Sequence, residues 1–321
     1  MNNPWTNITG NLNYKYEFNG QGHELTVDAD YSTYDRESVN NLRTIYRDAN
    51  DQVAQPTEDI RNLMPSVIDI YAVKADYVLP IKNGRKFEAG IKSSYIQSDN
   101  NLVFESFLDN RWNYDETRSN HFKYSENINA AYVNFGGKLN DKTTIQMGLR
   151  VEQTSSEGNS VTLNQVVKRE YTNLFPTFFL SRQIDSSNVL NISYSRRIDR
   201  PNYQSLNPFI FYLDPYTYQQ GNPYLQPQMT HSLQLVHTYK NTFSTTLGYS
   251  HTTDVIIHEV PGQIPEENIT YVQAQNMANQ DNVNLTLSYP VKVKNWWNIQ
   301  NYFTLFYNHL TSPYLGSAEK V

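Results

Sequence analysis

The chain has 321 residues, of which 38% are hydrophobic, 13% aromatic and 18% charged, and its formal net charge is −6. No stretch approaches the roughly 20 consecutive apolar residues of a spanning helix, which excludes a helical membrane protein. The acidic balance argues against nucleic-acid binding, and the absence of cysteine excludes a disulfide scaffold and thiolate chemistry. The many aromatic residues and the low charge are typical of a β-barrel with a short apolar band and a polar lumen.

Apolar and polar residues alternate along most of the chain, which predicts β-strands. The first predicted pair covers about 12–18 and 23–32, with Gly20 and Gly22 in the turn between them. In its second strand Leu25 and Val27 share one face, and Asp28 and Asp30 share the other. Five further pairs are predicted at 67–79 and 87–97, 124–135 and 143–154, 171–182 and 189–197, 231–239 and 243–257, and 269–289 and 296–310.

Short turns within these pairs alternate with longer connections between them. Transmembrane barrels have short periplasmic turns and long external loops, whereas a soluble β-sandwich has no reason to place all its long loops on one side. The sequence therefore predicts an all-β fold, an antiparallel transmembrane β-barrel wall of about twelve strands. Aromatic residues beside the short turns are predicted to form the periplasmic girdle, namely Phe18, Tyr77, Phe87, Phe135, Tyr239, Phe243, Tyr289, Trp296 and Trp297.

Three segments carry a family resemblance. The first is AAYVNFGGKLNDKTTIQMGLRVEQTSSEG (130–158), and the second is REYTNLFPTFFLS (169–181). The third, SYSRRIDRPNYQSLNPF (193–209) followed by GNPYLQP (221–227), is the most specific because two loop signatures lie within one external loop. Through these segments the chain resembles the barrel region of TonB-dependent outer-membrane receptors, especially the outer-membrane β-barrel family common in Bacteroidota.

The resemblance implies a location in the bacterial cell outer membrane and a complete barrel of about 22 strands around a plug domain. It implies import of a bulky nutrient, with outer-membrane lipid, the plug, TonB and a small-molecule, siderophore or glycan ligand as partners. No cofactor is implied. Residues 1–321 are expected to be part of a barrel domain, without a signal peptide, a plug domain, a TonB box or the closing strands.

Charged residues of both signs fall on the predicted lumen face. Pairing between adjacent strands is favoured over direct contact with a substrate, because a lumen charge is usually bonded to a neighbour. The candidate lumen-facing residues are Asp28, Asp30, Asp76, Glu88, Lys92, Arg150, Glu152 and Arg197.

The connection at 200–227 combines prolines and turn-forming asparagines with many aromatic rings. Such a loop could stack on a sugar or on the aromatic group of a siderophore, although packing of an ordered loop is the favoured interpretation. The candidate ligand contacts are Arg200, Tyr203, Asn207, Phe209, Tyr212, Tyr216, Asn222 and Tyr224.

Catalytic and metal-binding patterns are absent from the sequence. The seven histidines show no ligand spacing, and there is no GxSxG motif, P-loop or dinucleotide fingerprint. The sequence therefore predicts neither an enzyme nor a protein metal site. Two alternatives to a receptor stay open, which are a self-contained twelve-stranded porin-like channel and a soluble carbohydrate-binding β-protein.

Overall fold

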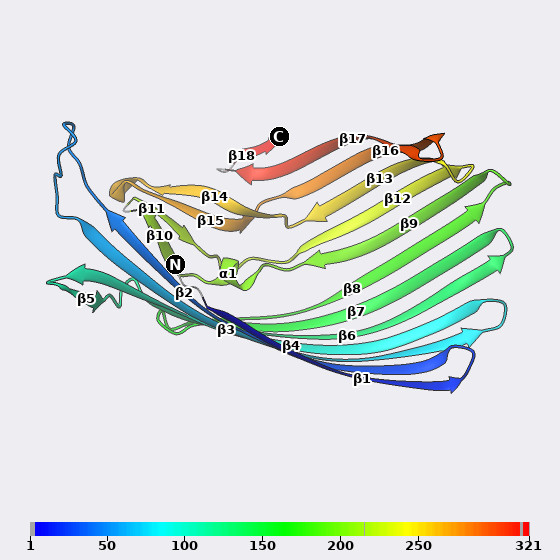
Figure 1. The fold of residues 1–321 in the computed structure, drawn as a ribbon, viewed down its shortest axis with the longest axis horizontal. Coiled ribbons are helices and arrows are strands. Elements are labelled where there is room, and N and C mark those ends of the chain that lie inside the picture. The colour runs from blue at the N-terminus through cyan, green and yellow to red at the C-terminus, as the bar shows by residue number, and fades with distance from the viewer. Residues whose placement is uncertain (1–3, 215, 315–316, 321) are drawn as a thin grey trace.

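The computed structural model describes residues 4–214, 216–314 and 317–320. One curved antiparallel sheet, with strands from β1 to β18, forms a wall (Figure 1). Two of its 14 strands are short additions, since β5 (Arg111–Tyr114) pairs with β4 and β18 (Ser317–Lys320) with β17. The twelve long strands confirm the predicted fold class. They are β1 (Trp5–Asn19), β2 (His23–Thr44), β3 (Glu58–Ile81), β4 (Arg85–Leu108), β6 (Asn120–Asn140), β7 (Thr143–Ser160), β8 (Gln165–Gln183), β9 (Asn188–Asp199), β12 (Gln228–Tyr239), β13 (Phe243–Thr253), β16 (Asn279–Lys294) and β17 (Trp297–Tyr314).

The strand register gives the wall one apolar and one polar face. Val27 on β2 pairs with Ala75 on β3, which pairs with Ile91 on β4, and such apolar pairs continue across the sheet to Leu285 and Leu305. Because side chains alternate between faces, the residues between them point to the opposite, polar face. An outward apolar band over a polar lumen is the pattern of a transmembrane barrel.

Rows of aromatic residues border the apolar band at both ends. At the end with the short turns, Phe87 pairs with Phe135. At the other end Tyr31, Tyr71 and Tyr95 pair across β2, β3 and β4, and we call these three the tyrosine row. Aromatic rings at these two levels suit the two interfaces of a bilayer, so the tyrosine row marks the external one.

The turns that join the two strands of each predicted pair lie at one end of the sheet, and the connections between pairs lie at the other end (Figure 1). Most of these connections are long, but β7 and β8 extend until only residues 161–164 join them. The strands nearest the N-terminus run far beyond their predicted ends, to 22 residues in β2 and 24 in both β3 and β4. About 9–11 residues suffice to cross a bilayer, so these strands continue well past the tyrosine row on the external side.

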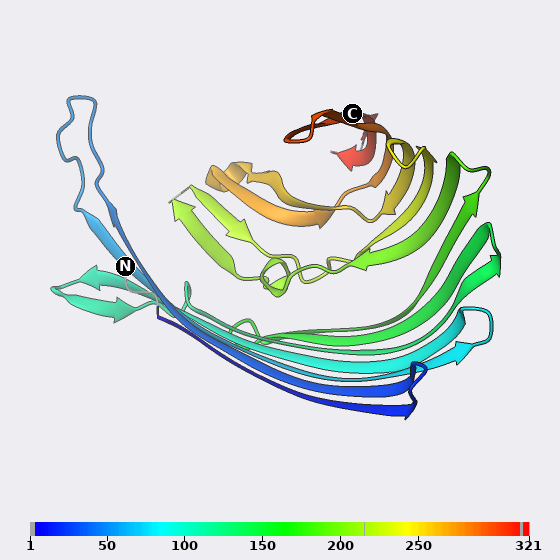
Figure 2. The same cartoon turned by 45° about the vertical axis from the view of Figure 1, so that its right-hand side comes forward.

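An inner layer lies inside the curve of the wall (Figure 2). It contains helix α1 (Tyr203–Leu206) and a second sheet with the order β10 (Ile210–Asp214), β11 (Thr217–Gln220), β15 (Ile269–Asn276) and β14 (Ile256–Ile264). Strands β11 and β15 run parallel, and this pairing joins the β9–β12 connection to the β13–β16 connection. A 3₁₀ turn, η1 (Pro265–Glu267), links β14 to β15.

The prediction of one unbroken strand over 269–289 is wrong, and so is the predicted end of its neighbour near 257. The chain leaves the wall after β13, where Asp254 has φ 56°, and it returns near Ala278, where φ is 124°. Residues 254–278 therefore form an external connection that folds inward as β14 and β15.

The inner layer has its own small core. Leu206, Leu225 and Ala274 are buried together, and Tyr124 and Ile256 pack against them. Tyr124 belongs to β6, so this core holds the inner layer against the wall. No helix among the described residues is long and apolar enough to cross a membrane.

The sheet is open. Over the described residues β1 pairs with β2 alone, and β17 pairs with β16 and β18, so the twelve long strands do not close on themselves.

Candidate functional site

Charged side chains anchor one flank of the inner layer to strands β7 and β8. Arg200, at the start of the β9–β12 connection, donates from its guanidinium to Glu152 (2.8 Å) and to the Thr154 hydroxyl (3.1 Å). Arg169 on β8 donates to the backbone carbonyls of Leu225 and Pro223. Charge-assisted bonds of this kind are stronger than neutral ones, so this flank is held firmly.

The two arginines lie on the external side of the tyrosine row and differ in electrostatics. Burial lowers the pKa of Arg169, which is bonded only to neutral carbonyls. Burial is the largest influence on Arg200 and acts to lower its pKa, but the hydrogen bonds and charge interactions with Glu152 and Tyr171 together outweigh burial and leave that pKa raised. Both groups stay charged at any physiological pH.

A cavity of about 770 Å³ separates the other flank of the inner layer from strands β2, β3 and β4. Its wall side includes Tyr34, Arg36, Ser66 and Asn100, which all lie just beyond the tyrosine row. Its inner side is formed by α1, by the β10–β11 hairpin and by residues of β14 and β15. The volume lies within the roughly 300–1,000 Å³ of sites that take small organic ligands.

Aromatic and amide groups dominate the cavity. Trp5 and Tyr34 stack, with ring centroids 6.5 Å apart and planes inclined by 22°, and Tyr203, Phe209 and Phe211 line the side of the inner layer. Amides line both sides, among them Asn100, Gln204, Gln219 and Gln220. Flat rings with amides between them can bind a solute that has apolar faces and many hydrogen-bonding groups.

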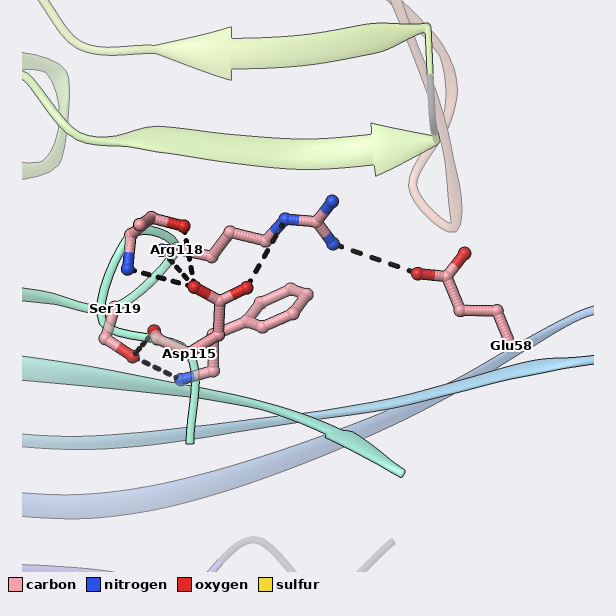
Figure 3. Close-up of polar contacts among 6 residues, drawn as sticks. Glu58, Asp115, Arg118 and Ser119 are labelled. Atoms are coloured by element: carbon pink, nitrogen blue, oxygen red, sulfur yellow. Dashed lines mark hydrogen bonds and ion pairs between the residues drawn. The ribbon is translucent and has the colours of Figure 1, made fainter. Parts of the chain in front are cut away.

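A polar cluster fixes the external corner between β5 and β6 (Figure 3). The Asp115 carboxylate accepts from the Thr117 backbone N–H (2.9 Å) and hydroxyl (2.6 Å), and the Ser119 hydroxyl accepts from the Phe104 N–H (3.0 Å). Arg118 lies 3.8 Å from both Asp115 and Glu58, with its guanidinium over the Phe104 ring. The positive charge of Arg118 is thus balanced within the chain.

The register places all eight predicted lumen-facing residues on the polar face of the wall. Six of them bond to neighbours. Asp28 and Asp30 accept from Asn13 (2.5 Å) and Asn11 (2.6 Å), and Asp76 pairs with Lys74 (2.7 Å). Glu88 pairs with Lys86 (2.6 Å), and Glu152 with Arg150 (2.7 Å) as well as Arg200. Lys92 and Arg197 have no ion pair within the described residues, and contact of any of the eight with a substrate stays a prediction.

Seven of the eight residues predicted to contact a ligand from the 200–227 connection separate into three groups. Tyr203, Asn207 and Phe209 line the cavity. Arg200 and Asn222 are used inside the chain, the latter donating to the Ala274 carbonyl (3.2 Å). Tyr216 and Tyr224 are 61% and 65% exposed away from the cavity lining, and the side chain of Tyr212 lies outside the described part of the structure.

The sequence prediction missed the half of the cavity that the wall supplies. Trp5, Tyr34 and Arg36 fell outside the predicted strands, which began at 12 and stopped at 32. The available signal was the presence of residues with β propensity beyond position 32, such as Thr33, Tyr34 and Val39, and not a continued alternation. His258 and Glu259 were likewise missed, because β14 leaves the wall and forms a hairpin with β15 that the prediction did not contain.

Within the described ranges, no group of three or more histidine, aspartate and glutamate side chains is arranged to hold a metal ion.

Solved structures of outer-membrane transporters share this fold. The ferric citrate transporter FecA superposes with a TM-score of 0.60 at 10% identity, over 95% of this chain and 42% of that chain. The siderophore receptor PiuA from Acinetobacter baumannii gives 0.60 at 12% identity, over 97% and 48%. The RagAB peptide transporter gives 0.56 at 15%, over 98% and 38%. The chain thus spans less than half the length of each of these three proteins.

The fold is therefore that of part of a TonB-dependent receptor barrel, and at these identities the similarity concerns the fold alone. No curated protein matches the sequence. A family model described as "Outer membrane protein beta-barrel family" matches residues 16–319, which is nearly the whole chain. The chain belongs to this outer-membrane β-barrel family.

Proposed function

We propose that this chain forms the wall and external loops of a TonB-dependent receptor that imports a bulky nutrient such as an iron chelate or a glycan. The observation that carries the proposal is the cavity between the inner layer and strands β2–β4. It lies on the polar face, just outside the tyrosine row, where a solute arriving from the medium would meet the barrel.

The cavity has a rigid flank and an open flank. Arg200 and Arg169 fasten the inner layer to β7 and β8, whereas no ion pair crosses the cavity between the inner layer and β2–β4 in the described part of the chain. A pre-formed site of this kind loses little conformational entropy when a ligand binds. The geometry therefore favours capture of a solute over simple packing of a loop.

In a complete receptor, the paired charges on the polar face would lie beneath this site, along the route from the cavity to the periplasm. Asp28, Asp76 and Glu152 are the centres of that network. We propose that they contact the plug domain or line a hydrated passage, and that TonB supplies the energy for transport.

A self-contained twelve-stranded channel is not supported. Such a channel would need its first and last long strands to pair, because unpaired edges cannot be satisfied within lipid. In the described residues β1 and β17 do not pair. A soluble β-protein is excluded by membership of the outer-membrane family.

The proposal is tested by deleting the gene and measuring uptake and growth on single iron chelates and single glycans. Loss of uptake of one nutrient, restored by the natural gene but not by one carrying Tyr203→Ala and Phe209→Ala, is the expected result. The matched control is Tyr224→Ala, an exposed aromatic outside the cavity, which should restore uptake fully. Unchanged uptake of every nutrient in the deletion strain would refute the proposal.

A further inference from the structure

We infer that the cavity binds an uncharged oligosaccharide and not an anionic metal chelate. This inference rests on the proposed uptake function and names the class of solute that the same site selects. Three features of the described residues support it. The cavity lining has little net charge, the arginines on the external side are already bonded within the chain, and aromatic rings lie beside amides that have no hydrogen-bond partner.

The lining carries little net charge. Arg36 and Glu259 are its ionised side chains and have opposite signs, and His258 adds a single imidazole. A ferric chelate built from carboxylates or catecholates is an anion, and proteins bind such anions with clusters of arginine and lysine. A lining with one positive and one negative group gives an anion no net attraction.

Arginines near the cavity are already neutralised or occupied. Arg43 pairs with Asp59 (2.6 Å), Arg61 with Glu105 (2.5 Å), and Arg118 with Asp115 and Glu58 (Figure 3). Arg169 and Arg200 are committed to the anchored flank. Recruiting any of these five arginines for an anion would break an existing bond, so they do not offer an anion a free basic cluster.

The polar groups that stay available are amides. Among the described residues, the side-chain amides of Gln204 on α1 and Gln219 on β11 have no hydrogen-bond partner, and both face the cavity. Each amide offers a donor and an acceptor side by side, which matches neighbouring hydroxyl groups on a sugar ring. Free amides in an uncharged setting favour a ligand that is itself both donor and acceptor.

The aromatic rings complete the match. The faces of Trp5, Tyr34, Tyr203 and Phe209 are apolar and carry the negative side of the ring quadrupole. A sugar ring presents a flat patch of C–H groups of slight positive polarity, which packs on such a face, while its hydroxyls lie at the edge within reach of amides. At about 770 Å³ the cavity takes a short oligomer and not a folded polymer.

The experiment uses the complete natural protein, purified in detergent, on an array of neutral oligosaccharides, with titration calorimetry for the best glycan and for ferric citrate. We expect retention of at least one neutral glycan and no binding of ferric citrate. The double variant Gln204→Ala/Gln219→Ala should weaken glycan binding about tenfold, since two neutral hydrogen bonds are lost. Arg36→Gln should change it less than about twofold, because no ion pair with the ligand is involved.

Two controls keep the outcomes distinct. Gln165→Ala removes an amide that bonds to Tyr224 outside the cavity and should leave glycan binding unchanged. Each variant must keep the heat-modifiable migration of the natural barrel. The inference is overturned by an array without bound glycan, or by ferric citrate binding that Arg36→Gln abolishes. Glycan binding in a protein whose deletion leaves all uptake intact would support the inference and refute the uptake proposal.

Discussion

The two halves of the wall reach different heights. Strands β2, β3 and β4 have 22, 24 and 24 residues, whereas β9, β12 and β13 have 12, 12 and 11. On the tall half the external residues continue the sheet. On the short half they leave it and fold inward as the inner layer. The cavity lies between the extended strands β2–β4 and the inner layer, so the difference in strand length creates the candidate site.

A local cause of the change lies between β8 and β9. Their pairing stops at Thr177 and Ser195, directly beside Pro176, whose backbone has no N–H to offer a neighbouring strand. Arg196 occupies the opening and donates to the Leu174 carbonyl (2.8 Å). Pro176 and Arg196 thus mark where β9 separates from β8 while the Leu174 carbonyl keeps a hydrogen-bond donor.

The largest effect on the inner layer is expected when the Arg200–Glu152 ion pair, which anchors it to the wall, is removed. Arg200→Met leaves the buried Glu152 with one partner fewer and should destabilise the inner layer by about 3 kcal/mol. Hydrogen exchange within 201–227 should rise while exchange in β2–β4 stays unchanged. The control Arg43→Met removes a solvent-exposed pair and should have a much smaller effect, because water and salt screen such pairs. Equal effects of the two variants would show that the flank is not anchored by charge.

A smaller loss of stability is expected from a substitution at Gly221, where two segments of the inner layer lie close together. A Cβ on Gly221 would overlap the backbone carbonyl of Asn207, so Gly221→Ala must displace α1 or the following turn, at a cost of about 2 kcal/mol. Gly10→Ala is the matched control, because nothing lies within 4 Å of its added methyl group. Thermal melting of the complete protein in detergent should separate the two variants. A Gly221→Ala protein with natural stability would contradict the packing described here.

The separation of β8 from β9 allows a finer test. Arg196→Met removes the donor to the Leu174 carbonyl and should cost about 1 kcal/mol, because water can replace part of this partly exposed bond. The effect should appear as faster hydrogen exchange near residues 174–177 and 195–200. If exchange rises over the whole of β8 and β9 instead, Arg196 supports the wall itself and not its opening.

The smallest expected effect depends on pH at the corner of Figure 3. Burial acts to raise the pKa of Asp115, but hydrogen bonds from Thr117 and Arg118 outweigh it, and the pKa lies below its ordinary value of 3.8. A depressed pKa stabilises the folded corner fully above the ordinary value and loses that effect as the pH falls through the folded one. Protection of the backbone amides of 115–119 from hydrogen exchange should therefore persist at pH 5. It should decrease only at pH values well below 4. In Asp115→Asn it should be independent of pH over this interval.

The sequence predicted the part of the wall that lipid constrains. In the apolar band one face must be apolar and the other polar, so alternation is strong, as in Leu25, Val27 and Ala29. Beyond the tyrosine row both faces meet water. There Asp35, Arg36 and Glu37 follow one another on a continuous strand, and the hydrophobic period disappears although the strand does not. The predicted ends were therefore the ends of the apolar band and not of the strands.

The candidate site was predictable only on the side of the 200–227 connection. Prolines and aromatics identified Tyr203, Asn207 and Phe209 as residues of an ordered loop, and they line the cavity. The second sheet was not predictable, because β11 and β15 pair across some fifty residues of chain that include two strands of the wall. Two local hairpins, β10–β11 and β14–β15, become one sheet only through this distant pairing.

The length of β3 outside the bilayer has one more consequence. Between Glu58 and Tyr71 this strand extends for about 40 Å at a rise of roughly 3.3 Å per residue, all of it on the external side of the bilayer. A solute held there has crossed no barrier, so its capture requires no work from the cell. If the protein imports a nutrient as proposed above, bacteria whose proton gradient has been collapsed should still adsorb that nutrient to their surface and lose only the ability to take it in.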